Sequence, residues 1–312
     1  MHRGILNTPH EERAAAAILL AVLATGCGTV TGLYSPAQLD RVGSAVTSAD
    51  GIRNELGVAN FLREHNRLWI YSWQDDVPYA RRSFLVLEFD ASGTLRNREV
   101  SRAVTPSTGI LTSHEQYCTA GGVCIEHGIA TDHGTDFDNA FSAVTVRGQA
   151  KGRISQPEPR AEECLLVIWP GGKWSRFPFH GVAVRVEDAS QWSSFHWLPS
   201  GAYARIVAPA GSHVVSVRDP NWDARHSIRE TPPKDFSTEW WLDLALRNYG
   251  TDATDAPPSS ATVQCQAGEQ VYLAVDSPID ETGLWFPITL RSVEATAAQA
   301  LLADRAQVLP PD

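Results

Sequence analysis

The sequence predicts an α+β fold: an N-terminal ααβββ two-layer module, then a mostly antiparallel β-sandwich with a helical insertion and a C-terminal helix. Apolar residues at helical spacing occur in only a few short stretches, whereas short runs typical of β-strands are dense after residue 160. Gly, Pro and Ser clusters separate these runs. Short strands with regular turns and no long helix between them are typical of a β-sandwich.

The segment 1–26 is predicted to be a signal peptide. Its apolar run Ala14–Leu23 has about ten residues, whereas a membrane-spanning helix needs about twenty. Leu23-Ala24-Thr25-Gly26-Cys27 resembles a bacterial lipobox, and this resemblance implies cleavage before Cys27 and lipidation of its sulfur and amine, for example by palmitate. In Gram-negative lipoproteins an Asp after the lipidated Cys commonly retains the protein in the inner membrane. Gly28 and Thr29 follow here, so we expect the periplasmic face of the outer membrane.

The first module, residues 27–103, contains a capped helix. Thr47 or Ser48 can accept the first helical N–H groups, and apolar residues follow at near-helical spacing. Gly57 interrupts this stretch, so we expect it to end one helix and to allow a second to start. The apolar positions are Ile52, Leu56, Val58 and Leu62.

Three antiparallel strands are predicted to complete the first module. Leu68–Trp73 and Ser83–Phe89 are apolar runs, and successive side chains of the second run alternate between the two faces of the predicted sheet. Asp90–Gly93 suits a tight turn, and Thr94–Arg102 is polar enough to form an edge strand. Helices on one side of such a sheet make a two-layer α+β module.

Parts of this module resemble the BamE (SmpA/OmlA) family of small outer-membrane lipoproteins. The matching parts, in order, are Leu56-Gly57, Trp69-Ile70-Tyr71-Ser72 and Phe89-Asp90-x-x-Gly93-x-Leu95. The family usually has Pro soon after the first of these glycines, whereas this chain continues with Val58-Ala59-Asn60. The resemblance implies a docking module, with the edge strand and the loop after Trp73 as candidate contacts.

The segment 104–160 is predicted to be a connector, because it is rich in Gly, Thr, Ser and Asp and lacks sustained periodicity. Cys and His are common zinc and copper ligands, but their spacing here matches no strong metal pattern. We favour a disulfide loop with solvated histidines over a metal site. The residues concerned are Cys118, Cys124, His114, His127 and His133.

Four cysteines besides Cys27 are an even number, which in an exported protein suggests disulfides. Of the three possible connectivities, we favour Cys118–Cys124 together with Cys164–Cys265. The first would close a short Thr-Ala-Gly-Gly loop, and the second would join two strands of the second module.

The second module, residues 161–312, is predicted to be the β-sandwich. It closes with a helix over Ala295–Asp304, whose Ala298, Leu301 and Leu302 would face the sheet. The predicted strands are Glu163–Trp169, Phe179–Glu187, Ser194–Leu198, Ala202–Ala208, Ser212–Arg218, Thr262–Gln266, Glu269–Asp276 and Trp285–Val293.

Three segments of this module resemble an uncharacterised family of small bacterial lipoprotein domains. They are Gly201-Ala202-Tyr203, Pro209-Ala210-Gly211-Ser212-His213-Val214-Val215 and Ala267-Gly268-Glu269-Gln270-Val271-Tyr272. The resemblance implies a fold and no chemistry. His213, beside a turn glycine, could be a ligand or an acid/base residue, but we expect a hydrogen-bonded structural histidine.

The insertion between the strands that end near Arg218 and start near Thr262 contains an amphipathic stretch, Asp235–Tyr249. Such a helix is expected to pack over one end of the sandwich. Trp240 and Trp241 within it are also candidates for a partner surface, because the cores of protein interfaces are enriched in Trp.

Composition and motifs narrow the function. The net charge of −10 and the lack of a Lys/Arg cluster argue against a nucleic-acid partner. Signatures of serine hydrolases, zinc proteases, phosphate loops and dinucleotide binding are missing from the sequence, so we expect no catalytic residue and no cofactor. The expectation is a non-catalytic, lipid-anchored periplasmic protein that contacts outer-membrane or envelope proteins during envelope assembly or maintenance. The alternative is a ligand- or metal-binding envelope lipoprotein that uses the Cys/His-rich connector.

Overall fold

A computed structural model of the chain describes seven stretches, and Tyr34–Asp312, which contains them, forms a compact unit. Several predicted features lie outside them: Cys27, His133, the loop after Trp73 and the helical insertion with Trp240 and Trp241. The described residues are 34–74, 82–101, 114–128, 142–171, 181–218, 259–276 and 288–312.

Two capped helices open this unit. Helix α2 (Pro36–Arg41) begins with a capping box, in which the Ser35 side chain and the Gln38 side chain each accept from the other's backbone N–H. Helix α3 (Ala49–Leu56) begins at Ser48, whose hydroxyl accepts from the N–H of Gly51 at 3.2 Å. Gly57, with φ +81°, ends α3 in a conformation that suits glycine.

The second helix predicted after Gly57 is wrong. The chain instead forms the short strand β1 (Phe61–Arg63), and the second helix of the pair is α2, which precedes α3. Strand geometry is favoured because Phe61 and Arg63, two residues apart, are both buried while Leu62 between them is half-buried.

Strands β2 (Leu68–Gln74), β3 (Arg82–Phe89) and β4 (Leu95–Val100) complete a sheet in the antiparallel order β1-β2-β3-β4. Strand β4 therefore lies at an edge, as its polar sequence predicts.

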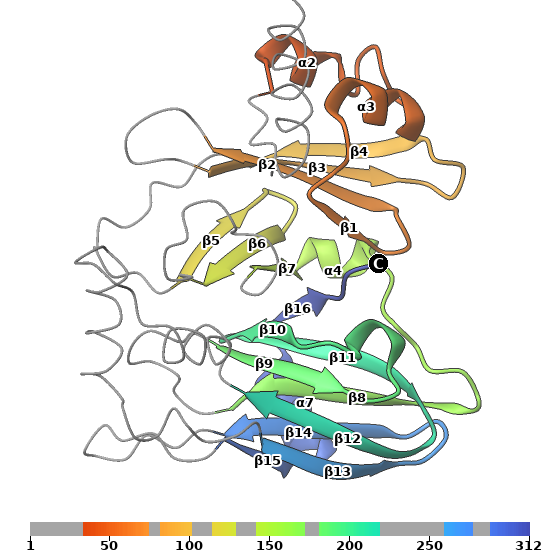
Figure 1. The fold of residues 1–312 in the computed structure, drawn as a ribbon, viewed down its shortest axis with the longest axis vertical. Helices are drawn as coiled ribbons and strands as arrows, with labels where there is room; N and C mark the ends of the chain where they lie inside the picture. Colours follow the sequence, from red (N-terminus) through yellow and green to blue (C-terminus); the bar gives the residue numbers. More distant parts are fainter. Residues whose placement is uncertain are drawn as a thin grey trace, which may run out of the picture. The chain divides into compact units, whose positions relative to one another are not determined.

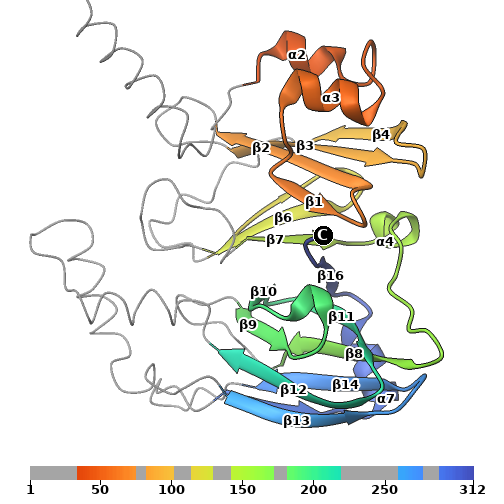
Figure 2. The ribbon, with the colours of Figure 1, turned by 45° about the vertical axis from the view of Figure 1, so that its right-hand side comes forward.

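Both faces of this sheet are buried, so the two-layer prediction is incomplete. Helices α2 and α3 lie over one face, where Leu85, Leu87 and Phe89 form a core with residues of α3 (Figure 1). On the other face, Phe84 and Val86 pack against residues of three further strands (Figure 2). The side-chain alternation of β3 is confirmed, but each of its faces contacts a different core.

The segment 104–160 is not a plain connector. It contributes an antiparallel meander, which is followed by the short helix α4 (Gln149–Arg153). The meander strands are β5 (His114–Cys118), β6 (Val123–Gly128) and β7 (Ser142–Val146). Their short length hides the periodicity, and Ile125 and Val144 are buried against the N-terminal sheet.

An eight-stranded sheet has the order β15-β14-β8-β11-β16-β7-β6-β5 and packs against a four-stranded sheet, β10-β9-β12-β13. The two sheets enclose a shared core in a sandwich-like arrangement, but the larger sheet includes β5–β7 and is therefore not confined to the predicted range 161–312. The remaining bounds are β8 (Glu163–Pro170), β9 (Gly181–Val186), η1 (Ser190–Trp192), β10 (His196–Pro199), β11 (Ala202–Pro209), β12 (Gly211–Arg218), β13 (Ser259–Cys265), β14 (Gln270–Asp276), β15 (Thr289–Ser292) and β16 (Ala306–Leu309).

Strand β16, which the sequence did not predict, joins the meander to the sandwich. It pairs in parallel with β11 through Ala202 and Ala306, and in antiparallel with β7 through Val144 and Leu309. The sheet is continuous only because this strand lies between the two parts.

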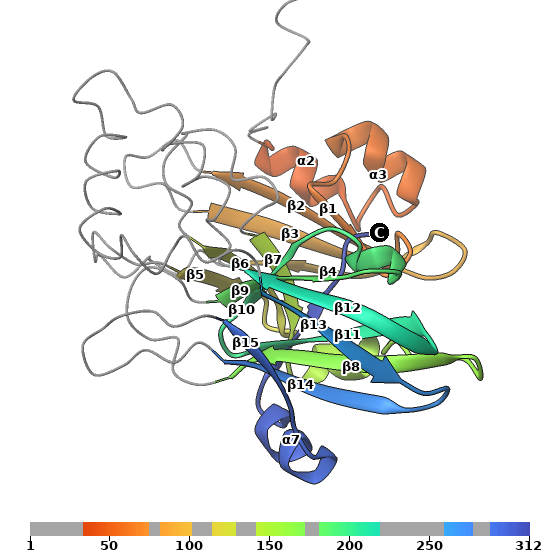
Figure 3. The ribbon, with the colours of Figure 1, turned by 60° about the horizontal axis from the view of Figure 1, so that its bottom comes forward.

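The C-terminal helix is present as α7 (Ala295–Leu302), which lies against the outer face of the β8–β14 region (Figure 3). Ala298 is fully buried and Leu302 packs beside it, four residues on. Leu301 is 55% exposed, so its predicted contact with the sheet is wrong. One helical face centred on Ala298 and Leu302 leaves Leu301 at the margin.

Candidate functional site

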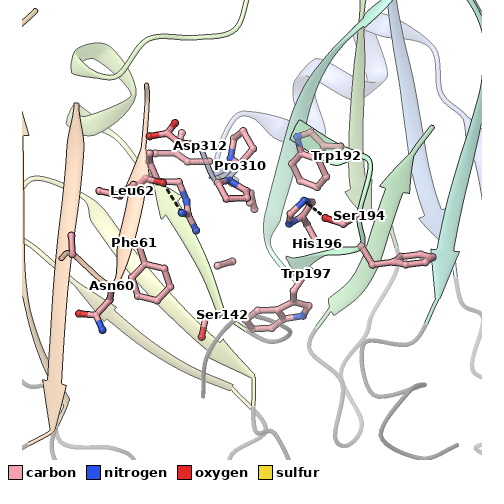
Figure 4. Close-up of a pocket in the computed structure, with 17 residues that line it drawn as sticks. Asn60, Phe61, Leu62, Ser142, Trp192, Ser194, His196, Trp197, Pro310 and Asp312 are labelled. Atoms are coloured by element: carbon pink, nitrogen blue, oxygen red, sulfur yellow. Dashed lines mark hydrogen bonds between the residues drawn. The ribbon is translucent and has the colours of Figure 1, made fainter. Parts of the chain in front are cut away.

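A cleft of about 390 Å³ lies between the edge strands β1 and β10. Figure 4 shows Asn60, Phe61 and Leu62 on one side of it. On the other side are residues of η1 and β10, including Trp192 and His196, and the segment after β16 completes the lining.

Arg63 at the end of β1 is the buried cation of this cleft, with 8% of its surface exposed. Its Nη1 donates to the carbonyl oxygen of Leu62 at 2.7 Å, and its guanidinium carbon lies 5.5 Å from the centre of the Phe61 ring. Its Nε is buried without a hydrogen-bond partner among the described residues. Burial lowers the pKa of Arg63 to about 10, although the negative charge of Asp312 acts to raise it.

Asp312 is held in place by the turn between β1 and β2. Its carboxylate accepts from the N–H groups of His65 at 2.8 Å and Asn66 at 2.6 Å. Glu64, His65 and Asn66 all have positive φ, between +56° and +60°, which turns consecutive N–H groups toward one anion. Left-handed backbone costs about 1–2 kcal/mol per non-glycine residue, so the bound carboxylate compensates for local strain.

The opposite wall carries His196 within an aromatic setting. Its Nε2 lies 3.1 Å from the Ser194 hydroxyl, and its ring meets the Trp192 ring edge-on at 5.2 Å between centres. Burial, and then the positive charge of Arg63, lower the pKa of His196 below its ordinary 6.5. Both effects disfavour the charged form of His196. Trp192 is buried, and its Nε1 has no hydrogen-bond partner within the described stretches.

A groove of about 380 Å³ follows the outer edge of β4. It is lined by Leu95–Arg98 and by the turn between α2 and α3. The N–H of Leu95 donates to Thr47 O at 2.8 Å, and Arg98 Nη2 donates to Leu39 O at 3.0 Å. These contacts hold the start of β4 under the helices. Arg96 is exposed at the same edge and pairs with Asp90 at 2.8 Å.

The predicted Cys/His cluster is only partly described. Cys118 and Cys124 face each other across the β5–β6 pair and are joined by a disulfide, so neither sulfur is free to bind a metal ion. The backbones of His114 and His127 lie in β5 and β6. In the described part of the chain, no group of three or more His, Cys, Asp or Glu residues could hold a metal ion.

Two other predictions from the sequence concern described residues. Cys164 and Cys265 form the second favoured disulfide and are both buried. His213 is 3% exposed, and its Nε2 lies 2.6 Å from the carbonyl oxygen of Pro209, which is the structural setting expected for it.

Sequence reasoning missed the cleft residues Arg63, Trp192, His196 and Asp312. They come from three separate segments, because only Trp192 and His196 lie close together in the sequence, and no motif connects the three segments. The one local signal is the Phe61-x-Arg63 pair, which places a cation on the same strand face as an aromatic ring.

Comparisons of the chain with protein-family models, with curated proteins and with solved structures found no match. Within the described stretches, no helix combines the length and apolar character that crossing a membrane requires.

Proposed function

We propose that this protein is an exported, lipid-anchored and non-catalytic protein on the periplasmic face of the outer membrane. It works through protein–protein contacts in envelope assembly or maintenance. The observation that carries the contact role is the groove beside edge strand β4, and the lipobox ending on Cys27 supports the anchor.

The two disulfides support export. Both lie in β-sheets, and Cys124, Cys164 and Cys265 are each at most 1% exposed. Structural disulfides form and persist in oxidising compartments such as the bacterial periplasm and are rare in the cytosol.

The groove beside β4 supports docking of an extended segment. An edge strand carries backbone groups that an incoming strand can pair with, and such pairing is a recurring mode of peptide recognition. Two positive side chains, Arg96 and Arg98, and one negative side chain, Asp40, line this groove on a chain whose net charge is −10. We therefore propose that the partner presents an extended segment with acidic side chains. The BamE-like resemblance assigns the same strand as a docking element.

Palmitate labelling tests the anchor. The full chain expressed in a Gram-negative host should incorporate labelled palmitate and fractionate with outer membranes, whereas Cys27→Ser should do neither. Cys118→Ser combined with Cys124→Ser is the matched control, since it removes cysteines without touching the lipobox. Labelling of the Cys27→Ser protein, or recovery of the unaltered chain in the cytosol, would overturn the anchor.

Site-specific photocrosslinking tests the docking strand. A photoreactive residue at Val100, which is 41% exposed at the end of β4, should crosslink to an envelope protein in intact cells. The same probe at Gln299, exposed on α7, is the control. Charge reversal by Arg96→Glu should weaken the Val100 adduct. Equal crosslinking from both positions, or none from Val100, would contradict the proposal.

A further inference from the structure

We propose that the cleft between β1 and β10 binds a small organic monocarboxylate, with the carboxylate against Arg63 and a flat apolar body between the aromatic walls. This site is separate from the groove beside β4, so it does not depend on the docking role proposed above.

The charge of the cleft points to an anion. The guanidinium of Arg63 is buried, yet its hydrogen bond within the described chain goes to the carbonyl of Leu62 and its Nε has no partner. A buried cation that forms no ion pair within the described chain is unfavourable, and a carboxylate that binds two guanidinium N–H groups would supply that pair.

The carboxylate of Asp312 also lines the cleft and its charge acts on Arg63, but it forms no ion pair with the guanidinium. Its two oxygens accept from the N–H groups of His65 and Asn66, and the described ion pairs include none between Asp312 and Arg63. Asp312 instead holds the turn that follows Arg63. Arg63 lines the cleft, and its five guanidinium N–H donors exceed the one hydrogen bond that it makes within the described chain.

The walls suit an aromatic or other flat apolar body. Phe61 lies on the β1 side and Trp197 on the β10 side, and both are buried residues that line the cleft (Figure 4). The volume of about 390 Å³ falls in the range of sites for small organic ligands.

The polar groups of the opposite wall, which carries His196, favour a ligand with a single negative charge. Burial and the positive charge of Arg63 disfavour a charge on His196, and its Nε2 lies beside the Ser194 hydroxyl rather than a carboxylate. These groups can donate or accept hydrogen bonds but add no second positive charge. A single carboxylate therefore fits the cleft better than a dicarboxylate or a phosphate.

Calorimetry with paired probes tests the site in the purified full chain carrying Cys27→Ser, which avoids lipid. Benzoate and indole-3-acetate should bind, and their neutral amides should bind at least 10-fold more weakly. Succinate should bind more weakly than either monocarboxylate. Equal affinity for acid and amide, or no binding by either acid, would overturn the proposal.

Substitutions of Arg63 test whether this residue binds the carboxylate. Arg63→Met should abolish binding of benzoate, and Arg63→Lys should retain a weakened affinity because the charge remains without the planar fork. Arg160→Met, at an exposed arginine outside the cleft, is the matched control and should bind like the unaltered chain.

A second readout covers the case in which a variant fails to fold. Benzoate added to the chain with native Arg63 should shift the ring resonances of His196, and His213 serves as an internal control because it does not line the cleft. A shift at His213 alone would contradict the assignment. Crosslinking from Val100 should be unaffected by Arg63→Met, so failure of this site and failure of the docking role are distinguishable.

Discussion

The carboxylate of Asp312 accepts hydrogen bonds from the backbone N–H groups of His65 and Asn66, across a sequence separation of 247 and 246 residues. This contact stabilises three consecutive left-handed residues in the turn after β1. It also places the charge of Asp312 close enough to Arg63 to influence its pKa. The segment after β16 and the N-terminal sheet therefore form one wall of the cleft together.

Asp312→Ala should lower the free energy of unfolding by about 1 kcal/mol, because two charge-assisted hydrogen bonds are lost at an exposed position. Urea denaturation of the purified chain measures this change. Asp304→Ala, at an exposed carboxylate near α7, should change stability by less than about 0.5 kcal/mol. Equal effects of the two substitutions would show that Asp312 does not hold the turn.

Arg63→Met should raise the free energy of unfolding at pH 7 by about 1–3 kcal/mol, because it removes a desolvated cation whose burial outweighs the opposite charge of Asp312 and which forms no ion pair within the described stretches. Thermal and urea denaturation check this, with Arg160→Met as the surface control. A destabilised Arg63→Met protein would mean that the guanidinium has a stabilising partner. A substitution that raises stability and at the same time abolishes benzoate binding is typical of a residue kept for function.

Arg63→Met should also raise the pKa of His196 toward its ordinary value, since the nearby positive charge is removed while burial remains. A pKa below 6.5 in the folded chain means that the unfolded chain binds the proton more readily. The stability contributed by His196 is therefore present above pH 6.5 and lost as pH falls through the folded pKa. NMR titration of the His196 ring in both proteins measures the change, and an unaltered pKa would place Arg63 too far away to act.

Loss of the Cys164–Cys265 disulfide should destabilise the chain more than loss of Cys118–Cys124. The two bonds span 101 and 6 residues, and a loop of about 100 residues contributes about 4.7 kcal/mol against less than about 3 kcal/mol for a loop of under 15. Urea denaturation of the paired Cys→Ala variants tests the order. The reverse order would indicate that packing around the cysteines outweighs loop closure.

Phe84→Ala should lower the free energy of unfolding by about 3–5 kcal/mol, as expected for a fully buried aromatic residue. In a two-layer module the same residue would face solvent and the change would be small. Leu301→Ala, at a site that is 55% exposed, is the matched control and should be nearly neutral. A small effect of Phe84→Ala would show that the β5–β7 meander does not cover the sheet.

Local patterns in the sequence were enough to predict most elements. Ser48 and Gly57 fix the two ends of α3 through capping and a left-handed backbone, and both effects act within a few residues. The alternation along β3 and the polar sequence of β4 predicted a buried strand and an edge strand. Turn glycines and short apolar runs likewise marked the strands of the sandwich.

Only the tertiary structure decided how these elements combine. Alternation assigns residues to two faces of β3 but does not say that the second face packs on β5–β7, because that contact joins segments distant in the chain. The same limit hid β16, whose four residues are ordered by pairing with β11 and β7. The cleft depends on both arrangements. Residue types and local spacing determine helices, strands and turns, whereas the burial of Arg63 beside His196 arises only when four separate segments pack together.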